Sequence, residues 1–177
     1  MRLIMSYSFA KHLHNYACWT AARAVQRNFT TTNKIIKAIE SSDLVKVEEL
    51  QIETADEYDR FHKVCCNQII DFFKNQLNTT ASYGRAAKII AIYLKTAVVI
   101  RYSGEGKLAR IAHPPIDRIL LTNLYKKHPE LSVDKTTWTK LDEQSYFDLI
   151  SKIRNLQLNS FWELEEYWDA SNEKYEK

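Results

Sequence analysis

Two features between residues 82 and 121 have residue types that could do chemistry together. Gly84 stands in a Tyr83-Gly84-Arg85 turn that opens a predicted helix. A phosphate could approach this turn closely, because glycine has no side chain and the N–H groups at a helix start are free to donate. Pro115 suits the first position of the next predicted helix and places Asp117 in its first turn, where the helix dipole favours the ionised form. A phosphate clamp and a positioned carboxylate are two parts of an enzyme that acts on nucleic acid.

Basic residues are concentrated around these two features. Residues 82–128 carry nine lysines and arginines against two acidic residues, a net charge of +7, although the whole 177-residue chain carries only +3. A basic segment in a nearly neutral protein is typical of a surface that contacts a phosphate backbone. We therefore expect Arg85, Lys107 and Arg110 to contact DNA, together with Tyr83 and Gly84. The alternative is an ordinary solvated helix face.

A second group of residues lies near the N-terminus. His12, Tyr16, Trp19 and Arg23 follow the spacing that places side chains on one stripe of a helix. Such a stripe could stack on bases and contact phosphates, or it could belong to the core with an arginine that reaches out to solvent. His12 and His14 do not have the spacing of metal ligands on a helix, so we expect no metal site.

The elements that position these residues are predicted to be helical almost throughout. Only three glycines and three prolines occur, too few for the many turns of a sandwich or barrel. Capping-box patterns begin helices at Thr54 and Ser160, and the most apolar helix, residues 83–102, is expected at the centre. Further helices are predicted over residues 8–27, 34–41, 44–50, 115–127 and 142–155, with an exposed basic connection over 103–114. We expect one compact all-α domain of seven to eight helices over residues 1–177.

Several classes of protein are disfavoured by what the sequence lacks. The three cysteines provide neither a disulfide framework nor a zinc-ligand spacing, which favours a reducing environment. No signal peptide is visible, and the apolar run 89–100 is interrupted by Lys95 and too short to span a bilayer. We therefore expect a cytoplasmic protein with no membrane partner. Nucleotide-binding glycine loops, the serine-hydrolase elbow and the zinc-protease motif are absent.

The order of the two central features resembles the helix-hairpin-helix DNA glycosylases. Ser82-Tyr83-Gly84-Arg85 is similar to the hairpin turn whose glycine backbone grips a DNA phosphate, and Pro115-Ile116-Asp117 to the motif that supplies the catalytic aspartate. More narrowly, four segments resemble a bacterial family akin to 8-oxoguanine DNA glycosylases: residues 19–24, 84–88, 113–117 and 161–166.

The resemblance implies a function and roles for individual residues. Asp117 would be catalytic, and release of a damaged or modified base from duplex DNA would serve repair or antiviral defence. In lyase-competent relatives a lysine follows the glycine turn by two residues; Ala86 stands there, so we expect a monofunctional glycosylase. Lys88, about half a turn beyond the position of the family's lysine, is the second catalytic candidate. From the stripe on the first helix, we expect Arg23 to bind DNA and Trp19, Tyr16 and His12 to form the base pocket.

We expect a monomer that needs neither metal nor organic cofactor. The alternative is a non-enzymatic helical module that binds nucleic acid or another protein, in which Asp117 only caps its helix.

Overall fold

The computed structural model describes residues 7–169, and every regular element within that range is helical. The α-helices are α1 (Phe9–Val25), α2 (Thr32–Glu40), α3 (Ala55–Leu77), α4 (Tyr83–Leu94), α5 (Lys107–Ile111), α6 (Arg118–Lys127) and α7 (Glu143–Arg154). Between and after them lie the 3-10 helices η1 (Asp43–Glu49), η3 (Pro129–Leu131), η4 (Trp138–Lys140) and η5 (Phe161–Tyr167), and the π-helix η2 (Lys95–Ile100). The all-α prediction is confirmed for these residues, although the helical segments outnumber the seven or eight expected.

Helix α4 occupies the centre of the molecule, as its apolar sequence predicts. It packs against α1, α3, α7 and η4, and ten of its twelve residues are buried. The side chain of Ser82 caps the helix by accepting a hydrogen bond from the N–H of Arg85 at 3.2 Å. The predicted helix 83–102 is therefore present, but it changes from α to π geometry at Lys95.

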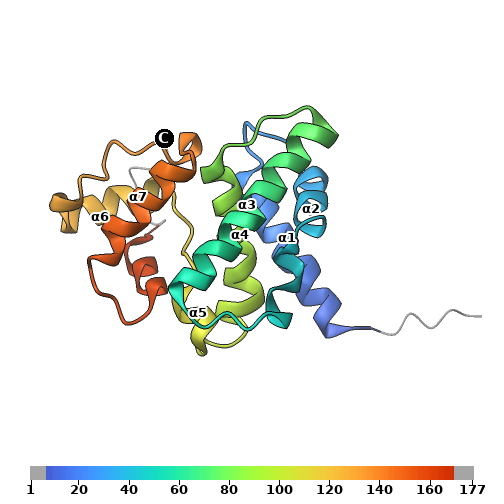
Figure 1. Cartoon of the computed structure of the whole chain (residues 1–177), viewed down its shortest axis with the longest axis horizontal. Coiled ribbons are helices and arrows are strands. Elements are labelled where there is room, and N and C mark those ends of the chain that lie inside the picture. The colour runs from blue at the N-terminus through green and yellow to red at the C-terminus, as the bar shows by residue number, and fades with distance from the viewer. Residues whose placement is uncertain (1–6, 170–177) are drawn as a thin grey trace, which may run out of the picture.

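The helices form two groups on either side of this centre (Figure 1). Helices α1, α2, α3 and α4 lie side by side in one group, while α6 and α7 lie in the other with the C-terminal segment. One continuous set of buried side chains runs through both groups, from Ala17 on α1 to Leu164 on η5. The described residues thus form one compact domain. None of their helices is long and apolar enough to cross a membrane.

Local signals placed most helix starts correctly. The Thr54–Glu57 capping box opens α3, and the Ser160–Glu163 box opens η5, which is a 3-10 helix rather than an α-helix. Asp142 caps α7 through the N–H of Ser145 at 2.8 Å.

The segment between η2 and α6 differs from the prediction. Residues 103–114 were expected to form an exposed basic connection, but they contain α5, and residues 112–117 are buried. Pro115 does not begin the following helix. Because a proline disfavours helical geometry in the residue before it, the His-Pro-Pro run stays non-helical and α6 begins only at Arg118. Asp117 is therefore the N-cap, with φ −144° and ψ −179°, and not a residue of the first turn.

Candidate active site

Lys88 is a buried cation on the central helix. It lies among Ala86, Ala87, Ile89 and Ile90, all buried, and is itself 9% exposed. Since α4 is covered by neighbouring helices, this side chain has little contact with water. A lysine in such a place requires a partner of opposite charge.

Asp117 provides that partner. Its Oδ2 accepts a hydrogen bond from Lys88 Nζ at 3.1 Å and a second one from the indole Nε1 of Trp168 at 3.1 Å. Its Oδ1 caps α6 by accepting from the N–H of Leu120 at 3.0 Å. The two residues predicted to be catalytic, 29 positions apart in the chain, are thus in direct contact.

Two tryptophans enclose this ion pair. Lys88 Nζ lies 4.5 Å from the ring centroid of Trp138, a distance suited to a cation–π interaction. Trp168 covers the carboxylate from the C-terminal side and is 40% exposed. The side chains of Lys88 and Asp117 are 10% and 12% exposed, so electrostatic forces between them are screened less than at the surface.

A cavity of about 250 Å³ lies beside Trp138 and Arg118, although neither Lys88 nor Asp117 lines it. Trp138 lines it and also contacts Lys88, while Arg118 lines it and directly follows Asp117. Several threonines of the segment before η4 complete the wall, among them Thr136 and Thr137. The arrangement combines an anionic oxygen, an ammonium group and two indole rings, and the wall of the nearby cavity carries Arg118, Lys135 and Asp134.

Neither tryptophan was predicted to belong to this site. Trp168 meets Asp117 across 51 positions, and Trp138 meets Lys88 across 50, so no local spacing connects them. Only the packing of η4 and η5 against α4 and α6 brings them there.

Gly84 has a different role from the phosphate clamp that we expected. A Cβ at this position would lie 1.9 Å from the carbonyl oxygen of Trp138, so only glycine fits. The N–H of Gly84 donates to the carbonyl oxygen of Leu141 at 3.1 Å. The protein's own segment between Trp138 and Leu141 therefore covers the surface where a phosphate was expected, and the glycine holds that segment against α4.

The neighbours of Gly84 are also engaged by the protein itself. Tyr83 was expected to contact DNA, but it is 4% exposed and its hydroxyl hydrogen-bonds with Nδ1 of His62 at 3.2 Å. Arg85 is half-buried, with its guanidinium carbon 4.8 Å from the ring centroid of Phe29. Tyr83 is thus a core residue, and Arg85 keeps only part of its surface free.

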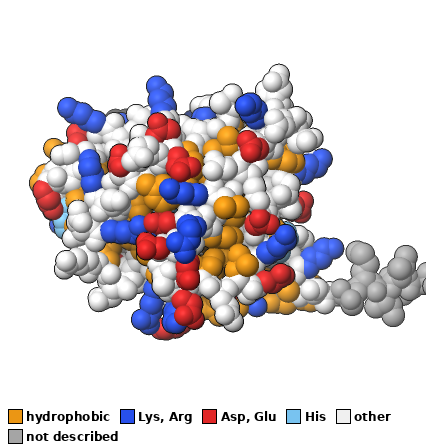
Figure 2. Space-filling view, viewed as in Figure 1, with side chains coloured by type: hydrophobic (Ala, Val, Ile, Leu, Met, Phe, Trp, Pro, Cys, Tyr) orange, Lys and Arg blue, Asp and Glu red, His pale blue; other side chains and the backbone are white. Residues whose placement is uncertain are grey.

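Acidic side chains neutralise much of the basic middle segment. Lys107 pairs with Glu53 at 2.8 Å, Arg110 with Glu105 at 3.3 Å and Arg101 with Glu48 at 2.7 Å. Lys95 pairs with Glu165. Figure 2 shows acidic and basic side chains interspersed on the face that it draws, with hydrophobic side chains between them. The excess charge that residues 82–128 show in the sequence is therefore partly cancelled by residues from elsewhere in the chain.

The stripe on α1 lies on the surface and away from the Lys88–Asp117 pair. Its four members, His12, Tyr16, Trp19 and Arg23, are all exposed, so the core interpretation of this stripe is wrong. In Figure 1, α4 lies between α1 and the group containing α6, whose N-cap is Asp117. The structure thus does not bring the predicted base-pocket residues to the predicted catalytic pair.

A second polar cluster lies inside the protein. Nε2 of His113 contacts Oδ1 of Asp59 at 3.1 Å, and Arg154 holds both oxygens of Asp59 at 2.7 and 2.8 Å. Burial opposes ionisation of Asp59, but these hydrogen bonds outweigh it and hold the pKa of the carboxyl below its usual range. Burial lowers the pKa of His113, whose Nδ1 also hydrogen-bonds with the hydroxyl of Tyr146 at 3.0 Å.

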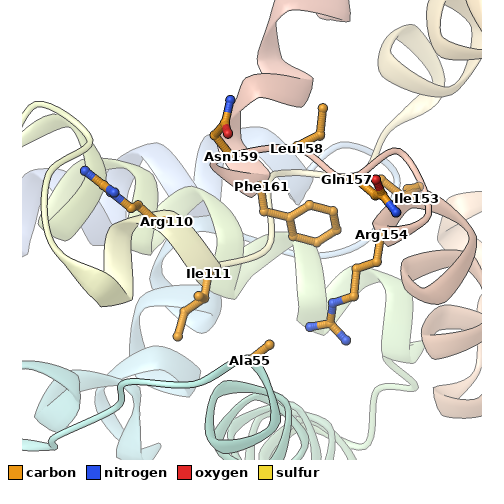
Figure 3. A pocket seen from close by; sticks show the side chains of 9 residues that line it. All are labelled: Ala55, Arg110, Ile111, Ile153, Arg154, Gln157, Leu158, Asn159 and Phe161. Carbon is orange, nitrogen blue, oxygen red and sulfur yellow. The ribbon is translucent and has the colours of Figure 1, made fainter.

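Arg154 forms part of the wall of a cavity of about 260 Å³. Figure 3 shows the Phe161 ring in the middle of this cavity, with Ile111 and Arg154 beside it. His113 itself is fully buried, and the Arg154 guanidinium is already neutralised by Asp59. This cluster therefore stabilises the junction of α3, α7 and the segment before α6.

Comparisons with models of protein families, with curated proteins and with solved structures found no match to this chain. Within residues 7–169, no group of three or more histidine, cysteine, aspartate or glutamate side chains could hold a metal ion.

Proposed function

We propose that this protein is a DNA glycosylase that hydrolyses the bond between a damaged or modified base and its sugar. The observation that carries the proposal is the buried contact of 3.1 Å between Lys88 Nζ and Asp117 Oδ2 beside two tryptophans. Both residues were selected as catalytic candidates from the sequence alone, Asp117 through the helix-hairpin-helix resemblance and Lys88 as a lysine that follows the glycine turn. The proposal includes a fold of the helix-hairpin-helix type and a damaged or modified base as the group that is released.

The chemistry follows from the charge that develops during bond breaking. An enzyme of this kind flips a nucleotide out of the duplex, and departure of the base leaves positive charge on the sugar. An ionised Asp117 in a site with little water would stabilise that charge and could activate the attacking water. The Leu120 N–H and the Lys88 ammonium hold the carboxylate in place. Trp168, which occupies Oδ2, would have to leave for the sugar to approach.

Among the candidate lysines, the contacts favour Lys88. Lys95 binds Glu165 and lies 5.7 Å from the ring centroid of Trp168, whereas Lys88 contacts Asp117 directly. In the hydrolytic reaction Lys88 is a positioning residue for the carboxylate. If it instead attacked the sugar as a neutral amine, a Schiff base would form and borohydride would trap it.

The experiment measures release of free base and formation of alkali-labile sites on duplexes that carry a panel of damaged and modified bases. We expect abasic sites without efficient strand nicking from the wild type. Asp117→Asn should lower the rate by about 10²–10³. Asp142→Asn is the matched control, because Asp142 also caps a helix but touches no lysine. Variants are compared after circular dichroism shows that each is folded.

Three outcomes would count against this scheme. Absence of base release across the whole panel would refute the glycosylase, and equal rates in the two asparagine variants would remove Asp117 from catalysis. A borohydride-trapped complex that disappears in Lys88→Gln would replace hydrolysis by a lyase reaction.

A non-enzymatic binding module is the second candidate, and one observation favours it. Both carboxylate oxygens of Asp117 are already used by donors of the protein itself, namely Leu120, Lys88 and Trp168. In that case the ion pair only ties α4 to α6 and η5. The same assay separates the candidates, because a module would release no base from any duplex.

A further inference from the structure

Charge is segregated at the N-terminal end of the chain more strongly than in its middle. Residues 1–39 contain six lysines and arginines and no acidic residue, while the other 138 residues carry a net charge of −3. The first acidic residue is Glu40, at the end of α2. Helix α1 therefore contains basic groups and no acidic residue, and α2 contains a single acidic residue, Glu40, at its last position.

The fold does not neutralise these groups as it does the middle segment. Of the described basic residues in this region, none has a carboxylate within 4.0 Å among residues 7–169. Those residues are Lys11, Arg23, Arg27, Lys34 and Lys37. All except Lys34 are exposed.

Two aromatic rings lie exposed on the same helix. Tyr16 and Trp19 are 52% and 48% exposed, with their ring centroids 5.8 Å apart and their planes inclined by 26°. The opposite side of α1 packs against α4 through small residues such as Ala17 and Ala21. The large rings therefore lie on the outer side of α1, with about half of their surface in contact with solvent.

A concave surface continues from this stripe. Arg23 is a member of the stripe and also lines an open cavity of about 730 Å³, together with Arg27, Gln26 and Thr30. The aromatic rings and the two arginines are thus parts of one surface. We call it the α1 surface and define it by Tyr16, Trp19, Arg23 and Arg27.

We propose that the α1 surface binds single-stranded nucleic acid. Bases stack on Tyr16 and Trp19, and the phosphates contact Arg23 and Arg27, since a basic surface with exposed aromatic rings suits an unpaired strand of any sequence. A paired duplex hides the faces of its bases except at its ends, so stacking favours a single strand over a duplex. The proposal does not depend on the glycosylase, because α4 lies between α1 and α6, which begins after Asp117 (Figure 1).

The test is fluorescence anisotropy with a labelled oligothymidylate of about twelve nucleotides, over a series of salt concentrations. Trp19→Ala should weaken binding about tenfold or more by loss of stacking. Arg23→Gln with Arg27→Gln should reduce the slope of log K against log salt by about 1.4. Lys126→Gln with Lys127→Gln is the matched control, because these two lysines are exposed on α6 and removing them changes the net charge equally. The control should bind as the wild type does.

Several results would overturn the proposal. These are no binding of the oligothymidylate, unchanged affinity in Trp19→Ala, or equal losses in the α1 and α6 charge variants. Tighter binding of a closed hairpin duplex than of the single strand, if Trp19→Ala weakens both equally, would also overturn it. Self-association that Trp19→Ala abolishes, without oligonucleotide binding, would instead assign the surface to a second copy of the chain. Asp117→Asn should bind the oligonucleotide normally, so failure of the glycosylase and failure of this proposal are distinguishable.

Discussion

The ion pair between Lys88 and Asp117 should make a large and measurable contribution to stability. Removing one partner of a buried pair typically costs about 3–5 kcal/mol, because the other charge is left uncompensated. In Asp117→Asn, an amide oxygen can still cap α6, but the amide N–H group then faces two donors, Lys88 and Trp168.

Two remaining interactions reduce the loss of stability in Asp117→Asn. Asparagine is as good an N-cap as aspartate. The Lys88 ammonium also keeps its position near the Trp138 ring, and a cation–π contact away from water is worth up to about 2 kcal/mol. We therefore expect Asp117→Asn to lower the free energy of unfolding by about 2–3 kcal/mol, less than for a pair without these contacts. For a domain of this size that corresponds to a decrease in Tm of about 4–12 °C.

The assay is urea unfolding followed by helical circular dichroism at pH 7, on the wild type, Asp117→Asn, Lys88→Met and the double variant. Methionine has a similar length without the charge, so the double variant leaves no unpaired ion in the site. We expect it to be more stable than the sum of the single losses indicates, by at least about 1 kcal/mol. Asp142→Asn should change stability by less than about 0.5 kcal/mol, because it keeps a helix cap and breaks no ion pair. A coupling energy below about 0.5 kcal/mol would refute the reasoning.

Three further predictions concern other parts of the protein. Gly84→Ala should destabilise the fold by about 3 kcal/mol in urea unfolding, because its Cβ would lie 1.9 Å from the Trp138 carbonyl oxygen; an unchanged midpoint would contradict the close approach. Burial lowers the pKa of His62 well below its usual value, so the unfolded chain binds a proton below about pH 6.5 that the folded protein does not. The stability that His62 contributes is present above that pH and is lost on acidification, by up to about 2 kcal/mol at pH 5, and His62→Phe should flatten the curve between pH 7 and 5. Burial raises the pKa of Cys18 and of Cys65 to about 12, and that of Cys66 well above its usual value. A thiol reagent at pH 8 should therefore label all three only after unfolding, and rapid labelling of the folded protein would contradict their burial.

The positions of most helices could be predicted from the sequence, because helix signals are local. Capping residues such as Thr54, Ser82 and Asp142 act over three positions, and apolar periodicity acts over a few turns, so both can be detected without knowledge of the fold. The same local patterns correctly made residues 83–102 the central helical segment. They failed where a proline pair, residues 114 and 115, kept the chain extended and moved the start of α6 to Arg118.

For the candidate site, too, the sequence predicted the residue types and the tertiary structure decided the contacts. Lys88 and Asp117 could be selected from the sequence by their motifs, but the distance of 3.1 Å between them is a property of how α4 packs near the start of α6. The net charge of residues 82–128 overstated the charge of the folded surface. Glu48, Glu53 and Glu165 belong to distant segments, and they pair with basic residues of this segment. The exposure of Tyr16 and Trp19 was equally undetermined, because a helical stripe of aromatic residues can face either the core or the solvent.

Sequence alone determined that the described chain is helical, where most of its helices begin, and that Lys88 and Asp117 stand in the two segments with residue types suited to chemistry. Those properties depend on interactions between residues a few positions apart. Tertiary structure decided that Gly84 packs against Trp138 and not against a ligand, that tryptophans about fifty positions away enclose the ion pair, and that α1 turns its rings outward. Contacts of this kind depend on which helix faces exclude water together, and that choice is made by the whole chain at once.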